Sequence, residues 1–435
     1  MSQVRPFEAI PFVELPPDYQ KRLGPLLAEA YEKCGPIFRS TYFGQEIVYL
    51  VGPEANRFVL VHDRFKFSNY IGWSAIFSVV DMFGRGLLSM DGQEHARHRK
   101  MMNPAFTVSY MDRYLPLMNR IIHQRAATWL EAGEVDIYDE ARKITFDIAA
   151  SALTGLEVGP EVDRFRELFI RILMIPGQAS SDEDFYRQLR QVHGELHALL
   201  LPKIEERRQR PTDDIFGMLV QARDEEGQAM SDEQLIAHIN ILLVAGHETS
   251  TSLSAWLLYL LTQHPDYAQR VLVEQAEILG ERVDPNLEEI KRMKVLENAL
   301  SEAERLYPPV ANGPRGVVED VEFHGYHVPA GTMAFYSIVA SHMLPHIFAH
   351  PMVFDPDRFA PPREEHKKHP YALVGFGGGP RICIGINFAQ VEIKAMVSHI
   401  LRHYQLELAS NQEIIQFYTV TGSPLHGIKM RVSAK

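Results

Sequence analysis

The stretch Gly375–Gly385, which reads GFGGGPRICIG, decides how the rest of this chain is interpreted. It places one cysteine, Cys383, after four glycines and before an amphipathic pattern that predicts a helix over residues 384–403. Glycines permit unusual backbone dihedrals and leave room for a flat group beside the cysteine. We expect a thiolate at this helix N-terminus, near Arg381, to be stabilised by the helix dipole and by the guanidinium charge.

The cysteine alone leaves two chemical interpretations open. An activated thiolate serves either as a nucleophile or as a single axial bond to haem iron. The glycine run does not match a dinucleotide or phosphate fingerprint, because Pro380 stands where a third glycine is needed. The chain has 2 cysteines, so neither a disulfide framework nor a four-cysteine metal site is expected.

Length and composition describe a globular protein with a large core. The chain has 435 residues, of which 46% are hydrophobic and 23% are charged. Its net charge of −12 argues against general nucleic-acid binding. The N-terminus lacks the apolar run of a signal peptide, and cysteines are scarce. We therefore expect a cytoplasmic protein without a membrane anchor.

Hydrophobic periodicity predicts a mainly α chain with small β-sheets towards both ends. We expect β-rich parts at about 36–62 and 310–345, short C-terminal strands with turns at Gly422 and Gly427, and a helical remainder. One helix is expected over 287–307, ending at Pro308-Pro309. No linker composition interrupts the chain, so residues 1–435 are expected to form a single domain.

The most apolar stretch runs from residue 238 to residue 261, and its centre reads AGHETS. Charge in the middle of a membrane is costly, so a buried central helix is favoured over a membrane span. We expect the Thr249 hydroxyl to bond back to the Ala245 carbonyl, and Gly246 to allow a ligand close to the backbone. Glu248 beside Thr249 suits a proton relay. The alternative is an ordinary core helix with a few satisfied polar groups.

Two clusters of charge carry further alternatives. Glu302 and Arg305 share one helix face at i, i+3, with Arg358 as a candidate third member, and they form either a partly buried pair or a solvated surface pair. His95 and Arg99 share a face at i, i+4. They form either a clamp for a carboxylate or part of a solvated basic helix.

Together these motifs resemble the cytochrome P-450 haem-thiolate monooxygenases over nearly the whole chain and in the family's order. FGGGPRICIG resembles the cysteine-loop signature, and AGHETS resembles the oxygen-binding groove. SEAER resembles the ExxR pair, FDPDRF the meander, and GQEHARHRKMMNPAF the helix that contacts the haem propionates. The resemblance implies the cytochrome P-450 fold, with haem between the long central helix and the cysteine-loop helix.

The resemblance also implies roles for individual residues. Cys383 would be the axial iron ligand with Phe376 packed beside it, and Thr249 and Glu248 would handle dioxygen and its protons. Many members carry tryptophan where this chain has His95, although histidine also donates to a carboxylate. The propionates would be held by His95, Arg99, Arg315 and Arg381, and further cofactor contacts would come from Ala245, Gly246, Gly377 and Gly385.

The implied activity is insertion of one oxygen atom from O2 into an apolar substrate such as a fatty acid, terpenoid, retinoid or steroid-like molecule. The cofactor would be haem b. Electrons would come from a separate ferredoxin or flavodoxin with its reductase, since no reductase domain follows Lys435, and the protein is expected to be a monomer. A haem peroxygenase using H2O2 and a non-enzymatic haem sensor or carrier are the alternatives. Related peroxide-using enzymes lack the acid–alcohol pair, and a sensor has no need of it.

Substrate choice and partner docking are expected in separate places. By resemblance, specificity lies in residues 70–88, 164–200 and 309–312. A basic docking patch for an acidic electron donor is expected on segments that flank the cysteine face. Its predicted members are Arg97, His98, Lys100, Arg381, Lys394 and Arg402.

Overall fold

The computed structural model describes residues 4–410 and 412–435. The chain is mainly helical with small sheets, as the sequence predicts. The helices are α1 Leu23–Cys34, α2 Pro53–Arg57, α3 Asn69–Phe77, α4 Val79–Phe83, α5 Gly92–Met102, α6 Val108–Ala126, α7 Trp129–Ala132, α8 Ile137–Thr154, α9 Pro160–Gln178, α10 Asp182–Gln209, α11 Ile215–Gln221, α12 Asp232–Gln263, α13 Pro265–Leu279, α14 Leu287–Arg292, α15 Lys294–Leu306, α16 Ile338–Ser341, α17 Glu365–Lys368 and α18 Ile386–His403.

The strands form one larger sheet and three small ones. The larger sheet has the order β1-β2-β8-β5-β3, so a hairpin from the N-terminal part lies beside strands from the C-terminal half. The strands are β1 Ile37–Tyr42, β2 Gln45–Val51, β3 Phe67–Ser68, β4 Glu134–Asp136, β5 Asn312–Val317, β6 Val321–Phe323, β7 Tyr326–Val328, β8 Met333–Ser337, β9 Tyr404–Leu408, β10 Gln416–Tyr418, β11 Gly422–Pro424 and β12 Lys429–Ala434.

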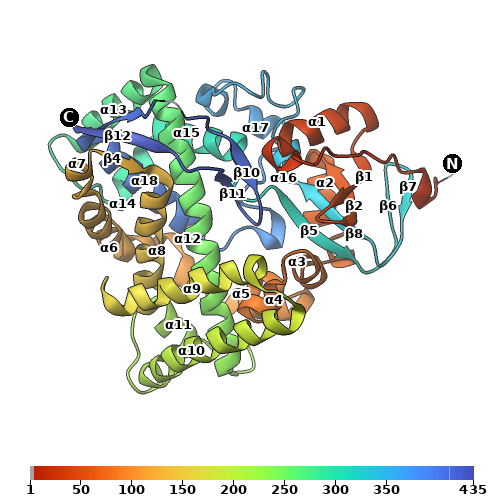
Figure 1. The fold of residues 1–435 in the computed structure, drawn as a ribbon, viewed down its shortest axis with the longest axis horizontal. Helices are drawn as coiled ribbons and strands as arrows, with labels where there is room; N and C mark the ends of the chain where they lie inside the picture. The colour runs from red at the N-terminus through yellow and green to blue at the C-terminus, as the bar shows by residue number, and fades with distance from the viewer. Residues whose placement is uncertain (1–3, 411) are drawn as a thin grey trace.

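Two regions divide the molecule. The larger sheet, α1 and the N-terminus lie on one side, and the helices from α6 to α15 lie on the other (Figure 1). β5 pairs with β8 antiparallel and places Arg315 opposite Ala334. Arg315 therefore lies where the sheet meets the helical region, and α5 and the cysteine loop lie there too.

The long helix α12 runs through the helical region (Figure 1). Ser231 and Gln234 form a capping box that satisfies the first backbone N–H groups and fixes where the helix begins. Apolar residues on both halves of α12 are buried against α8, α15 and α18. Tertiary burial of this kind stabilises the helix despite the glycine at its centre.

The structure corrects three boundaries. Residues 53–62, expected to continue the β-rich part, form α2 and a π-helical turn, because Pro53 at the first helical position starts a helix. The helix expected over 287–307 is two helices, α14 and α15, with the backbone break at Met293. Gly422 lies in β11 rather than in a turn, and the chain reverses over residues 419–421.

Candidate active site

The cysteine loop ends at Cys383, three residues before α18 begins. Its tight path depends on glycine, since Gly377 and Gly379 have φ values of 71° and 56°. A Cβ atom at Gly379 would also lie 2.8 Å from the carbonyl oxygen of Leu60. The N–H of Cys383 donates to the Phe376 carbonyl at 2.8 Å and closes the loop. The backbone thus holds Cys383 in one position.

The charge state of Cys383 depends on several neighbours. Burial raises the pKa of the thiol, and the carboxyl of Glu304 acts in the same direction. The N–H of Gly385 and the charge of Arg99 oppose this rise. The sequence predicted that Arg381 would supply the positive charge, but the guanidinium that acts on the thiolate is Arg99. A buried thiol of this kind becomes a stable thiolate when it binds a metal ion.

Four basic side chains from three parts of the chain gather above the loop. Arg99 donates to the Ile382 carbonyl at 2.6 Å, and Arg381 donates to the Met90 carbonyl at 2.6 Å and to Asp91 at 3.1 Å. His95 and Arg315 are 6% and 5% exposed. The charges of Arg99, Arg315 and Arg381 all act on His95, so the structure brings these four residues of α5, β5 and the loop together. Their binding of the propionates stays a prediction.

Their mutual repulsion shows in the pKa values. Burial, then the charges of Arg381 and Arg99, lower the pKa of His95 to about 3. Burial and the charge of Arg315 lower the pKa of Arg381 to about 10. Among the described residues, Asp91 is the only carboxylate that opposes these shifts. Three guanidinium groups with one acid suit a ligand that brings carboxylates, and the two propionates of haem b fit this set.

Helix α12 leaves room at its centre. Ala245 is exposed and Gly246 and Thr249 are partly exposed, whereas Leu242, one turn before Ala245, and Leu253, one turn after Thr249, are buried. Apart from its chain neighbours and the backbone of α12, no atom of the described residues lies within 4 Å of the position where Gly246 would carry a Cβ. The Thr249 hydroxyl donates to the Ala245 carbonyl at 2.6 Å, as predicted. The open strip along these residues fits a flat group and a small ligand beside the helix.

Glu248 lies on the side of α12 that faces α8. His247 Nε2 is 3.0 Å from its Oε1, and Arg142 Nε is 3.5 Å from the same atom. Burial opposes ionisation of Glu248, but the hydrogen bond to His247 and the charges of His247 and Arg142 together lower its pKa. The neighbour Arg142 was not predicted, because nothing in the local sequence links it to Glu248.

The Glu302–Arg305 pair is fully buried, so the surface interpretation is wrong. Arg305 donates to the Glu302 carboxylate from Nε at 2.7 Å and from Nη2 at 2.9 Å. Arg358 joins at 3.1 Å, as predicted, and it also donates to Glu365 at 2.7 Å. Glu302, Arg305 and Arg358 are all 0% exposed. This cluster links α15 to the meander that leads into the cysteine loop.

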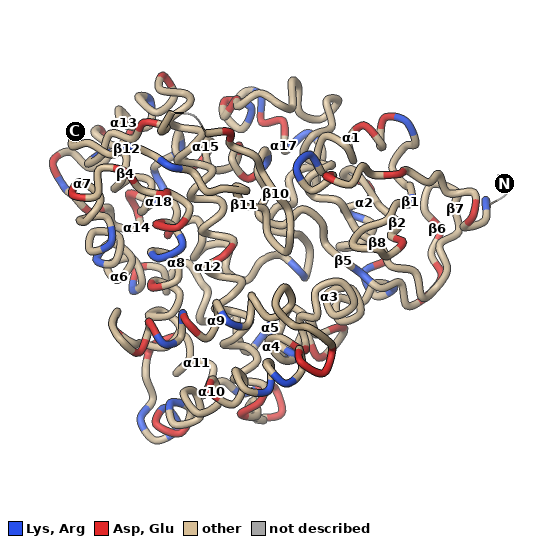
Figure 2. Tube along the Cα trace, viewed as in Figure 1, with Lys and Arg blue, Asp and Glu red and all other residues tan. Residues whose placement is uncertain are grey.

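Only part of the predicted basic docking patch lies on the surface: Arg97 and Lys100 are exposed, and Arg402 is half-buried and donates to the carbonyls of Val283 and Gly280. His98 is buried against His238, with 2.8 Å between the ring nitrogens, and Lys394 is buried beside Glu297 at 3.0 Å. Arg381 points inward to Asp91. The exposed Arg97 and Lys100 pair with Asp224 and Glu225. Basic and acidic residues are interspersed along α9 and α10 as well (Figure 2).

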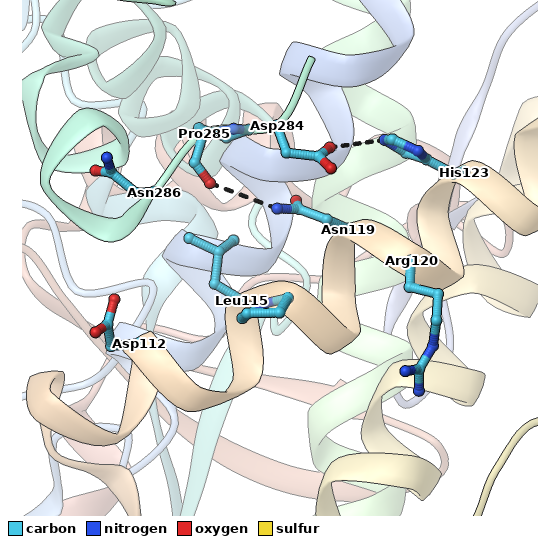
Figure 3. Close-up of a pocket in the computed structure, with 9 residues that line it drawn as sticks. Asp112, Leu115, Asn119, Arg120, His123, Asp284, Pro285 and Asn286 are labelled. Carbon is cyan, nitrogen blue, oxygen red and sulfur yellow. Dashed lines mark hydrogen bonds and ion pairs between the residues drawn. The ribbon is translucent and has the colours of Figure 1, made fainter. Parts of the chain in front are cut away.

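A surface pocket of about 510 Å³ lies between α6 and the segment before α14 (Figure 3). His123 lies 2.7 Å from Asp284 at its rim, and Asn119 donates to the Pro285 carbonyl at 3.4 Å. None of the residues predicted for the active site lines it. Its lining mixes acids and bases and does not define a ligand.

The fold and the site together define a haem-thiolate protein: one loop cysteine, a basic cluster for two carboxylates, and an open strip on a long helix. The chain matches the cytochrome P450 family model over residues 4–426. A putative cytochrome P450 120 of Synechocystis sp. is 32% identical over 92% of this chain and 90% of its own length. A putative cytochrome P450 136 of Mycobacterium tuberculosis is 33% identical over 87% of this chain and 78% of its own.

Solved structures agree. A cyanobacterial cytochrome P450 120 with bound retinoic acid superposes with a TM-score of 0.87 and 29% identity, covering all of both chains. The chain belongs to the cytochrome P450 family. It is a monooxygenase that uses haem b, O2, a hydrophobic substrate and a redox partner. Within the described residues, no helix is sufficiently long and apolar to traverse a bilayer.

Proposed function

We propose that this chain uses Cys383 as the iron ligand and oxygenates an apolar isoprenoid, with retinoids as the first class to test. The arrangement that carries the proposal is the open strip at Ala245, Gly246 and Thr249 together with the cysteine loop. The retinoic acid bound to the similar cyanobacterial structure supports the choice of substrate class. Fatty acids, terpenoids and steroid-like molecules are the other classes to compare.

In this proposal each residue has one task. When bound, haem b supplies the iron at which dioxygen is activated. His95, Arg99, Arg315 and Arg381 bind its carboxylates and orient it. Cys383 donates electron density through its sulfur. Protein side chains do the remaining work of binding substrate, excluding water and moving protons.

Proton delivery is assigned to the centre of α12. The Thr249 hydroxyl lies on the open strip, where it holds a proton beside the reacting oxygen. Glu248 is held as a carboxylate by His247 and Arg142, on the side of α12 that faces α8. We propose that it takes protons from the α8 side and passes them on through ordered water. A peroxygenase using H2O2, or a haem sensor, would need neither group.

Electrons come, in this proposal, from a separate ferredoxin or flavodoxin. Of the predicted docking residues, His98 and Lys394 are buried, and Arg97, Lys100 and Arg381 pair with acids. Only Arg402 has no acidic partner among the described residues, so the proposal does not include steering by a strong basic patch. First-electron transfer should therefore depend only weakly on ionic strength. We treat the protein as a monomer.

Turnover in three reaction mixtures tests the function. The purified holoprotein is given all-trans-retinoic acid with NAD(P)H and a ferredoxin–reductase system, with H2O2 alone, or with neither. Product that forms fastest with the reductase system supports the proposal. Product that forms as fast with H2O2 alone supports a peroxygenase, and no product with any of the four substrate classes supports a sensor or carrier.

A further inference from the structure

Two buried side chains hold the segment that leads into the cysteine loop. The N–H of Val374 donates to His342 Nε2 at 2.9 Å. The next two N–H groups, those of Gly375 and Phe376, donate to the carboxyl of Glu304. His342 is 0% exposed and Glu304 is 6% exposed. Three successive peptide N–H groups therefore end on side chains, where a loop would otherwise leave them unpaired or bonded to water.

The fit between Glu304 and Gly375 is close. A Cβ atom at Gly375 would lie 2.4 Å from Glu304 Oε1 and 2.6 Å from its Cγ. Real Cβ atoms essentially never come so close to another atom, so the Glu304 side chain would have to shift. The carboxyl thus occupies the volume that any larger residue at 375 would need, and the two positions depend on each other.

These contacts reach Cys383 through a single residue, Phe376. The carbonyl of Phe376, whose N–H is held by Glu304, accepts the N–H of Cys383 at 2.8 Å. On the other side, the carbonyl of His342 accepts Arg305 Nη1 at 3.0 Å. His342 and Glu304 therefore connect the buried Glu302–Arg305–Arg358 cluster to the cysteine loop.

The charge of Glu304 matters to the same site. Arg305, its neighbour in sequence, turns to Glu302, and no Lys, Arg or His forms an ion pair with Glu304 in the part of the chain that the structure describes. Burial raises the pKa of Glu304 to about 8, against the effect of the two N–H groups. A charged Glu304 raises the pKa of Cys383, so the neutral form that burial favours suits a thiolate nearby.

We propose that Glu304 and His342 are positioning residues that hold the cysteine loop in the geometry in which Cys383 binds iron. Neither touches the reacting atoms. The inference rests on the proposed role of Cys383 as iron ligand. It adds that Glu304 of α15 and His342, which follows α16, hold the loop in addition to its own glycines.

The test compares holoproteins that lose this support by different routes. Glu304→Leu and His342→Leu remove acceptors, and Gly375→Ala displaces the carboxyl without changing Glu304. The matched control is Glu274→Leu, because Glu274 also accepts two successive backbone N–H groups, from Val295 at 2.7 Å and Leu296 at 3.2 Å. We would measure the iron reduction potential and the rate at which the ferrous carbonyl spectrum changes from the thiolate type to a non-thiolate type.

We expect Glu304→Leu, His342→Leu and Gly375→Ala to lose the thiolate-type spectrum about tenfold faster than the parent, because each leaves a buried backbone N–H unpaired. They should also shift the reduction potential, whereas Glu274→Leu should lower the melting temperature and change neither readout. Parent-like rates and potentials in Glu304→Leu and Gly375→Ala overturn the inference, as does an equal change in Glu274→Leu.

One further variant covers poor folding. If Glu304→Leu gives too little holoprotein, Glu304→Gln replaces it, because the glutamine amide accepts hydrogen bonds through one oxygen only. A rate of loss of the thiolate-type spectrum between those of the parent and Gly375→Ala supports the inference. A parent-like rate and potential overturn it. A parent without a thiolate-type spectrum refutes the proposed role of Cys383 itself, which distinguishes the two failures.

Discussion

The buried carboxylate of Glu302 gives the most quantitative prediction for stability. It accepts four hydrogen bonds: two from Arg305 at 2.7 and 2.9 Å, one from Arg358 at 3.1 Å, and one from the Asp355 N–H at 2.9 Å. Both arginines are 0% exposed. Glu302→Leu keeps the volume but leaves Arg305 without a carboxylate, while Arg358 retains Glu365.

Removing one partner of a buried ion pair costs about 3–5 kcal/mol, because a charge is left uncompensated. Folded domains are stable by only about 5–15 kcal/mol, so Glu302→Leu should remove about a fifth or more of the total. The measurement is urea unfolding of the holoprotein, followed by far-ultraviolet circular dichroism and haem absorbance.

The control is a pair with the same two-pronged geometry on the surface. Arg270 donates to Asp357 at 2.9 and 2.7 Å, but the side chains are 50% and 47% exposed. Asp357→Asn should therefore cost at most about 1 kcal/mol. Equal losses of unfolding free energy for the two variants would refute the argument from burial.

Three further outcomes follow from the site. Thr249→Ala should bind haem and substrate normally but form less product and more H2O2 per NAD(P)H consumed, because positioned proton transfer contributes a factor of about 10²–10⁴ in rate. A parent-like yield of product per NAD(P)H would make Thr249 a packing residue. Arg315→Leu should release haem to an acceptor protein faster than the parent, whereas Arg431→Leu on the surface should not. Burial lowers the pKa of His238 to about 3, below its ordinary value of 6.5, so the unfolded chain binds an extra proton as pH falls below that value and stability declines. His238→Gln should flatten the fall in unfolding free energy by about 1.4 kcal/mol per pH unit between pH 6 and 4, and an unchanged slope would contradict this.

Local signals in the sequence predicted the elements that frame the site. The β-rich part that begins near residue 36, the buried helix over residues 238–261 and the helix after Cys383 each depend on residues that are neighbours in the chain. The back-bond from Thr249 to Ala245 follows from helix geometry alone. These predictions were right because hydrophobic periodicity and i, i+4 contacts require no knowledge of the rest of the fold.

Contacts between distant segments were missed or misjudged. Arg142 reaches Glu248 from α8, and His342 reaches Val374 from another part of the chain, so no spacing in the sequence indicates either contact. The docking patch failed for the same reason. The polar side chains of His98 and Lys394 predicted surface positions, but both are buried. His98 of α5 contacts α12, and Lys394 of α18 contacts α14 and α15.

The central claim is that Cys383 supplies the single sulfur bond to haem iron, and its substitution tests that claim most directly. The ferrous carbonyl spectrum distinguishes a thiolate ligand from a histidine ligand, and the chain's other cysteine, Cys34, provides the control. Cys383→His should bind haem yet lose the thiolate-type spectrum and the oxygenase activity, while Cys34→Ala keeps both. A thiolate-type spectrum that survives in Cys383→Ala, or disappears in Cys34→Ala, would contradict the account.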